Sequence, residues 1–115
     1  EAETNLGLDR VLHHDLSLSR EQEARIEALE ATFASQRKAL EADMRLANRE
    51  LAHAIVTDHR MSPAAEQAIG RFHQAMRQLQ ELTTAHVLSM REVLTPAQAA
   101  LFDRSVVRVL NADAS

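Results

Sequence analysis

Helix-breaking residues are scarce in this chain, because glycine and proline occur only twice each in 115 residues. Each proline directly follows a hydroxyl residue, in Ser62-Pro63 and Thr95-Pro96. Serine and threonine favour the position that caps the start of a helix, and proline favours the first helical position. So few breaks leave room for long helices and little room for β-hairpin turns. The sequence therefore predicts an all-α fold.

A further helix start lies at Ser19, where "SREQ" has a glutamine three residues after the serine. This spacing is typical of a capping box, in which each side chain bonds the backbone N–H group of the other residue. The stretch "TPAQ", 95–98, repeats it. These starts predict a short helix near 5–15, long helices near 20–57 and 63–93, and a short helix near 96–111. We interpret the whole chain, 1–115, as a single domain.

Both long predicted helices are amphipathic, because each has a stripe of mostly apolar residues three or four positions apart. Thr83 and His86 are the polar members of the second stripe. In the first they are Ile26, Leu29, Phe33, Leu40, Met44, Ala47, Leu51 and Ile55. In the second they are Ile69, Phe72, Met76, Leu79, Thr83, His86, Met90 and Val93. Such helices are marginal alone, so we expect the two stripes to pack together as an antiparallel hairpin that bends at 57–61. The resemblance of "LSREQ" (18–22) to "LTPAQ" (94–98) could come from an internal duplication, but we favour the simpler explanation that they are two independent capping boxes.

Composition narrows the classes of function. The formal net charge is −4, which argues against nucleic acid as a partner, and no basic stripe with aromatic residues is present. The sequence contains no run of 18 apolar residues, so it predicts no membrane-spanning helix. The absence of cysteine excludes disulfides and thiolate metal sites. The polar opening "EAETNLGLDR" fits a trimmed soluble fragment and a mature form equally well.

Three residues with metal-binding atoms lie in or beside the apolar stripes: Glu30, His86 and Met90. In one interpretation His86 is a hydrogen-bonded core histidine, Met90 fills space and Glu30 lies at the rim of the core. In the other all three are metal ligands. His53, His59 and His73 lie off the stripes, and we expect them to be exposed to solvent.

Helix geometry brings several of these groups to one level. At 1.5 Å per residue, Glu30 lies about 45 Å and His86 about 39 Å from a bend near residue 60. The first predicted helix joins the second near 17–19 and therefore lies at the same end, with Asp9 one turn before His13. Two imidazoles, two carboxylates and a thioether suit divalent transition metals, and a closed structural zinc site is not expected. No nucleophile or general base is left once the ligands are assigned, so we do not expect an enzyme.

Several stretches resemble a known family. "LSREQ" and "LTPAQ" are similar to the LTxxQ motif of the Spy/CpxP-like group, and "HVLSM" is similar to the His-x3-Met pair of its CnrX-type periplasmic heavy-metal sensors. The stretch "FASQRKALEADMRLANRELAHAI" resembles the long second helix of those sensors. The similarity covers most of 8–107.

The resemblance implies a four-helix hooked hairpin that forms a homodimer in the periplasm, anchored to the inner membrane by a preceding helix that this chain lacks. It implies a nickel or cobalt site formed by His13, Glu30, His86 and Met90, with zinc and copper as alternative metals. Asp9 stands where those sensors have a further histidine. The expected function is control of metal-efflux genes through a membrane-bound anti-sigma factor and its sigma factor. The alternative is a Spy/CpxP-like chaperone or stress adaptor that needs no metal.

Overall fold

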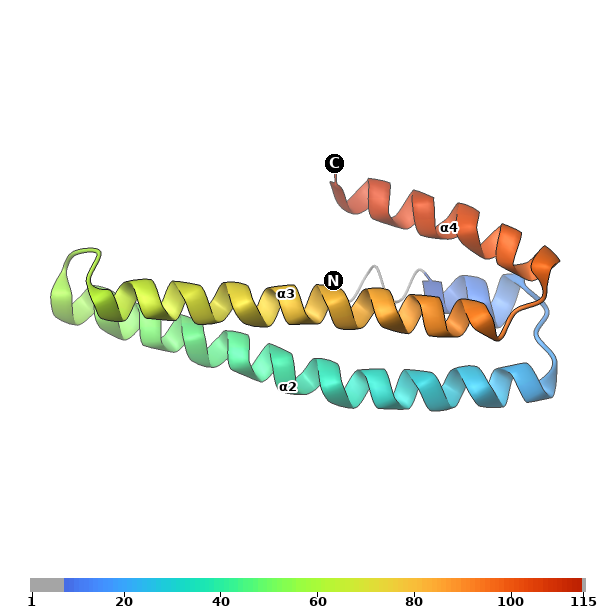
Figure 1. Cartoon of the computed structure of the whole chain (residues 1–115), viewed down its shortest axis with the longest axis horizontal. Helices are drawn as coiled ribbons and strands as arrows, with labels where there is room; N and C mark the ends of the chain where they lie inside the picture. Colours follow the sequence, from blue (N-terminus) through green and yellow to red (C-terminus); the bar gives the residue numbers. More distant parts are fainter. Residues whose placement is uncertain (1–7, 115) are drawn as a thin grey trace. The chain divides into compact units, whose positions relative to one another are not determined.

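The computed structural model describes residues 8–114, with side chains over 8–112. Its elements are helix η1 (Val11–Asp15), α2 (Arg20–Asp58), α3 (Pro63–Glu92) and α4 (Pro96–Ala114), and no strand occurs among the described residues (Figure 1). The all-α prediction is confirmed, and the boundaries of α2, α3 and α4 lie within three residues of the predicted ones. The start of the first predicted helix, 5–7, lies outside the described residues.

The helix starts follow the predicted capping chemistry. The Gln22 N–H donates to Ser19 Oγ at 3.1 Å, and the Ser19 N–H donates to Gln22 Oε1 at 2.9 Å. Thr95 and Gln98 repeat this box at 3.2 and 2.9 Å. At α3 the Ala65 N–H donates to Ser62 Oγ at 3.2 Å. These bonds satisfy backbone donors that the first turn of a helix leaves without an intrahelical acceptor.

The chain forms two compact units, one comprising residues 8–29 and 87–114 and the other Glu30–His86. Both α2 and α3 continue across the boundary between the units. The first unit has a core of large apolar side chains, which are Leu8, Val11, Leu12, Leu16, Ile26, Met90, Val93 and Phe102. Burial of side chains this large is the main favourable term in the stability of this unit.

The two capping boxes of the first unit meet through their glutamines. Gln22 Nε2 donates to Gln98 Oε1 at 2.8 Å and to the Val93 carbonyl at 3.0 Å. Gln98 Nε2 donates to the Leu16 carbonyl at 3.1 Å. We call these two residues the glutamine clasp. The clasp joins the segment before α2 to the turn between α3 and α4, so the two helix starts support each other.

The second unit is an antiparallel hairpin formed by α2 and α3, which run side by side in opposite directions (Figure 1). Its buried residues toward the bend are mostly small, namely Ala47, Ala54, Ser62, Ala65, Ala68 and Ala75. At the bend His59 has a left-handed backbone with φ of 56°, and its N–H donates to the Ile55 carbonyl at 3.0 Å. A left-handed residue directly after the last turn is a common way to end a helix.

The predicted stripes are wrong at two positions, where the residue that was expected to face inward is exposed to solvent. Ile55 is 54% exposed whereas Ala54 is 3% exposed, and Met76 is 42% exposed whereas Ala75 is 4% exposed. In α2 the inward positions follow a seven-residue repeat, at Ile26, Phe33, Leu40, Ala47 and Ala54. A seven-residue repeat keeps one face of each helix on its partner, whereas steps of four drift off that face. At both positions the prediction places the larger apolar residue in the helix interface, whereas the structure places the neighbouring alanine there.

The first helical segment also departs from the predicted α-helix, because Val11–Asp15 adopts a π-helix. Val11 and Leu12 of this segment are buried in the core of the first unit. A π-helix widens the turn by one residue and is seen mostly in short segments, often at functional sites. No helix among the described residues is both long enough and apolar enough to cross a bilayer.

Candidate metal centre

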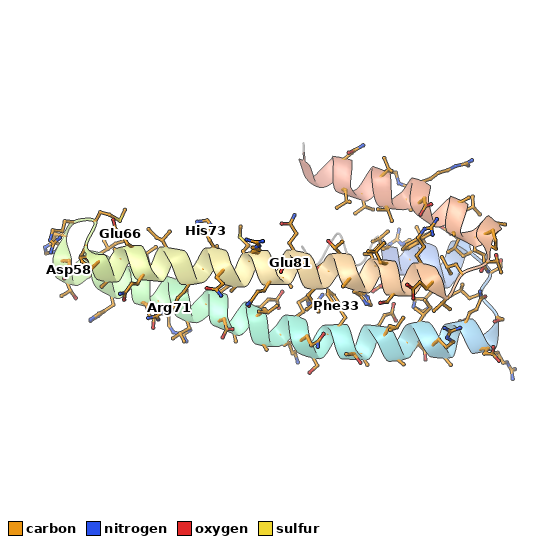
Figure 2. All side chains as sticks on the ribbon, viewed as in Figure 1. Phe33, Asp58, Glu66, Arg71, His73 and Glu81 are labelled. Atoms are coloured by element: carbon orange, nitrogen blue, oxygen red, sulfur yellow. The ribbon has the colours of Figure 1, made fainter. Side chains whose placement is uncertain are left out.

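His86 is the most strongly constrained of the predicted ligands in the second unit. It lies on α3, its side chain is 6% exposed, and its Nε2 atom is shielded from solvent. The imidazole stacks on the ring of Phe33 with ring centroids 4.3 Å apart and an angle of 4° between the planes. Figure 2 shows Phe33 reaching from α2 toward α3. The prediction that His86 points inward is confirmed.

Glu30 belongs to the same unit and is half-buried, one turn of α2 before Phe33. Its exposure fits the prediction that this carboxylate borders the apolar stripe. Arg37, one turn of α2 after Phe33, has its guanidinium 5.6 Å from the centroid of the Phe33 ring. Sequence reasoning placed Phe33 in the core but missed its stacking on His86. The available signal was the seven-residue repeat, which puts an aromatic ring and a histidine on the inward faces of two helices.

The first unit contains the other three predicted ligands. Asp9 and His13 are half-buried, and His13 lies within the π-helix η1. His14, its neighbour, is exposed. Met90 is fully buried within the apolar core, at 0% exposure. That burial agrees with a space-filling role, and it also agrees with a thioether that is kept away from water until a metal binds.

The chemistry of these groups fits a divalent transition metal. The Oδ1 atom of Asp9 is shielded from solvent, as is the Nε2 atom of His86. Imidazole nitrogen and carboxylate oxygen bind first-row metals, and a thioether adds a softer donor. Among the described residues no three His, Asp or Glu side chains gather as a group that could hold a metal ion. Asp9, His13, Glu30, His86 and Met90 therefore stay a predicted set of ligands.

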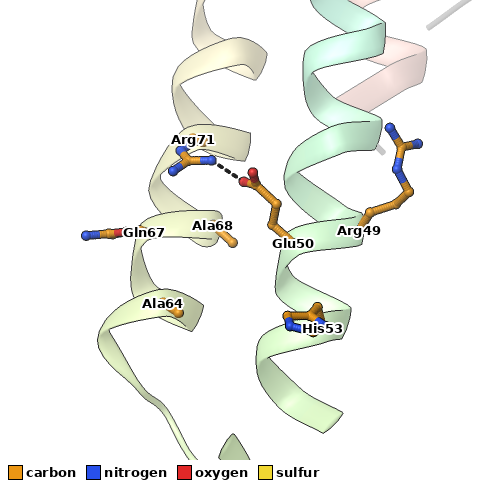
Figure 3. Close-up of a pocket in the computed structure, with 7 residues that line it drawn as sticks. All are labelled: Arg49, Glu50, His53, Ala64, Gln67, Ala68 and Arg71. Atoms are coloured by element: carbon orange, nitrogen blue, oxygen red, sulfur yellow. Dashed lines mark hydrogen bonds and ion pairs between the residues drawn. The ribbon is translucent and has the colours of Figure 1, made fainter. Parts of the chain in front are cut away.

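The remaining histidines agree with the prediction, since His53, His59 and His73 are all exposed. His53 lines a pocket of the second unit together with Glu50 and Arg71 (Figure 3). Glu50 forms an ion pair with Arg71 from the opposite helix. This carboxylate is therefore already neutralised by a cation, and we assign no metal to the pocket.

Comparison with known proteins gives two findings. The sequence model described as heavy-metal resistance matches residues 1–100. The chain is also 33% identical over 103 residues to the nickel and cobalt resistance protein CnrR of Cupriavidus metallidurans, a match that covers 90% of this chain and 70% of that protein. Neither description names a catalytic activity. Because the family match spans most of the chain and the relative supports it, this chain belongs to the heavy-metal resistance family and has a role in metal resistance.

Proposed function

We propose that this protein is a periplasmic sensor of divalent nickel or cobalt that controls the expression of metal-efflux genes. The observation that carries the proposal is the buried, stacked imidazole of His86 with its shielded Nε2 atom. A thioether, Met90, follows one turn later on the same helix. Membership of the heavy-metal resistance family and similarity to a nickel and cobalt resistance protein support this choice of metals.

The proposed ligands are His13, Glu30, His86 and Met90, and Asp9 is a further oxygen donor. When bound, the metal would supply a positive charge and a fixed coordination geometry, which bring donor groups together. Nickel and cobalt accept mixed nitrogen, oxygen and sulfur donors and more than four ligands more readily than zinc does. Zinc and copper are the competing metals to test.

The proposed signalling route leads through a membrane-bound anti-sigma factor to a sigma factor for resistance genes. We further propose that the protein acts as a homodimer, held at the inner membrane by a segment outside this chain. Exposed apolar side chains on α4 support an association of copies, because Leu101, Val107 and Leu110 are each about half exposed. Sedimentation at micromolar concentration should give roughly twice the chain mass of 12.8 kDa. A monomer with and without metal would remove the dimer from the proposal.

Calorimetric titration of the metal-free chain with nickel, cobalt, zinc and copper tests the sensor function. We expect one site per chain, and we expect the double substitution Glu30→Ala with His86→Ala to abolish tight nickel and cobalt binding while helicity is retained. His73→Ala is the matched control, because His73 is an exposed histidine of the same helix. If the double variant binds as the wild type does, these ligands are wrong. A chain that binds no metal but prevents client proteins from aggregating would instead indicate the chaperone function.

Met90→Leu separates the ligand role of Met90 from its packing role, since leucine keeps the volume and removes the sulfur. We expect weaker cobalt and nickel binding, an altered cobalt absorption spectrum and nearly unchanged zinc affinity. Met76→Leu on the exposed side of the same helix is the control. An unchanged cobalt spectrum in Met90→Leu would assign Met90 to the core alone.

A further inference from the structure

Three side chains of the second unit form a continuous stack that the proposed metal site does not by itself require. The imidazole of His86 and the ring of Phe33 are parallel within 4°, with centroids 4.3 Å apart. The guanidinium carbon of Arg37 lies 5.6 Å from the centroid of the Phe33 ring. Phe33 and His86 are both buried, so the ring contact is protected from water. We call these three residues the His86 stack.

The His86 stack restricts the rotation that matters most for a histidine ligand. The torsion that turns an imidazole about its bond to Cβ is normally broad, with no steep minima. A large ring lying flat against the imidazole removes most of that freedom, because any turn drives an edge of one ring into the other. The lone pairs of an imidazole lie in its ring plane, so the parallel contact also fixes the plane in which a metal can be bound.

Arg37 makes a further contact with the ring of Phe33. A guanidinium near an aromatic ring is attracted to the electron-rich face. The Arg37 Nε atom also lies 3.8 Å from a carboxylate oxygen of Glu41, one turn further along α2. Glu41 thus gives Arg37 a weak ion pair near the ring, and Phe33 has Arg37 as a second neighbour besides His86.

We infer that Phe33 is a positioning residue for His86, which sets the imidazole in its metal-binding plane before the metal arrives. The inference rests on the proposed function, because it assumes that His86 is a ligand. Residues that orient a histidine ligand without touching the metal commonly change metal affinity by about 10- to 100-fold when they are removed. A ligand oriented in advance binds more tightly, since less freedom is lost on binding.

The test compares Phe33→Leu with Phe72→Leu. Leucine is apolar and a good helix former, so both variants should fold, which far-UV circular dichroism checks. Phe72 is the matched control, because it also contacts a histidine, His73, at 5.8 Å between ring centroids, but in an edge contact and without a predicted ligand. Nickel and cobalt affinities are measured by calorimetry. The carbon-bound ring protons of His86 are followed by NMR in the metal-free protein, where a stacked aromatic ring shifts them upfield.

We expect Phe33→Leu to weaken nickel and cobalt binding by about 10-fold and to move the His86 ring protons downfield, with neither effect in Phe72→Leu. Arg37→Gln keeps the Phe33 ring and should produce smaller changes in metal affinity and in the His86 proton shifts, in the same direction. If Phe33→Leu does not fold, Arg37→Gln tests the positioning role in its place. The positioning role would be overturned if a folded Phe33→Leu bound nickel and cobalt with wild-type affinity. The same holds for Arg37→Gln where it replaces Phe33→Leu, and in both cases the proposed sensor function would be unaffected. A wild-type chain that binds neither metal would overturn both.

Discussion

The two compact units of this chain are packed with side chains of very different size. The first unit buries leucine, isoleucine, valine and methionine side chains together with Phe102. The hairpin of the second unit instead buries alanines toward its bend, such as Ala54 and Ala68. Large side chains stabilise by the apolar area they remove from water, and small ones by letting two helix backbones approach closely. The units should therefore fail for opposite reasons, the first when atoms are removed and the second when atoms are added.

The largest effect is expected from Phe102→Ala in the first unit. Phe102 has no exposed surface, so the substitution loses its transfer free energy and leaves a cavity in the core. We expect a loss of about 3–5 kcal/mol in the free energy of unfolding, measured by urea denaturation. Leu101→Ala is the neighbouring control, because Leu101 is about half exposed. Equal losses in the two variants would contradict the full burial of Phe102 in the core.

The second unit should respond to the opposite change. Ala68 is 1% exposed on the inward face of α3 and borders the pocket beside Glu50, so part of the larger side chain of Ala68→Leu can enter the pocket while the rest pushes against α2. We expect a loss of about 1–3 kcal/mol in the free energy of unfolding. Ala64→Leu, one turn earlier and exposed, adds the same atoms to solvent. If Ala68→Leu is as stable as Ala64→Leu, the hairpin is not closely packed at this level.

A smaller loss is expected when the glutamine clasp of the first unit is removed. Gln98→Ala deletes bonds to Gln22, to the Leu16 carbonyl and to the Thr95 N–H. Because the clasp is only partly buried, water can replace some of these partners, and we expect a loss of about 1–2 kcal/mol. Gln80→Ala tests the same residue type at an exposed position of α3. Equal thermal stability of the two variants would show that neither the clasp nor the capping bond to the Thr95 N–H adds measurably to stability.

Some features of the fold could be predicted from the sequence and others could not. Helix starts were predicted well, because the capping at Ser19, Ser62 and Thr95 depends on residues no more than three positions apart. The inward face of the hairpin was predicted less well near its bend. Apolar periodicity favours large residues and so points to Ile55 and Met76, whereas the structure buries the neighbouring alanines, which permit a closer approach of the helices. The π-helix at Val11–Asp15 could not be predicted, because apolar spacing in so short a segment does not distinguish a π-helix from an α-helix.

For the candidate metal centre, the sequence identified donor atoms and left their surroundings open. His86 was placed inward by its register, and the structure confirms this. The seven-residue repeat could have indicated that Phe33 and His86 face each other, but periodicity says nothing about ring orientation, so their parallel stacking was beyond sequence reasoning. We predict that one metal is bound by His86 together with Glu30, His13, Asp9 and Met90, and metal titration tests this prediction. Sequence patterns thus specify the chemistry of a site more readily than its geometry.

The smallest expected effect concerns two ion pairs between helices, one taken from each unit. In the first unit Arg91 donates two hydrogen bonds to Asp103, at 2.8 and 2.9 Å. In the second unit Arg71 pairs with Glu50. Both pairs are solvent-exposed and screened by salt, so each should contribute little to stability at neutral pH. The pair of the first unit has the better geometry, because its guanidinium and carboxylate meet through two parallel bonds.

The Asp103 pair also gives a pH dependence with a definite sign. Hydrogen bonds from Arg91 lower the pKa of the Asp103 carboxyl below its ordinary value of 3.8, and the attraction between the charges acts in the same direction. A carboxyl whose pKa is lower in the folded state stabilises the fold above its unfolded pKa, and this contribution is lost as pH falls through the folded value. Wild type should therefore have a slightly higher Tm than Asp103→Asn at pH 7, and the difference should disappear well below pH 3.8.

A double-mutant cycle with Arg91→Gln isolates the coupling between the two side chains. The same cycle on Glu50 and Arg71 supplies the second unit for comparison, and we expect its coupling to be the weaker of the two. Both couplings should fall in about 1 M salt, where charges are screened beyond about 3 Å. A coupling at Asp103 that persists at acid pH would mean that the carboxyl acts through packing and not through charge. In that case the turn between α3 and α4 would be held by the glutamine clasp and the apolar core, with no electrostatic contribution.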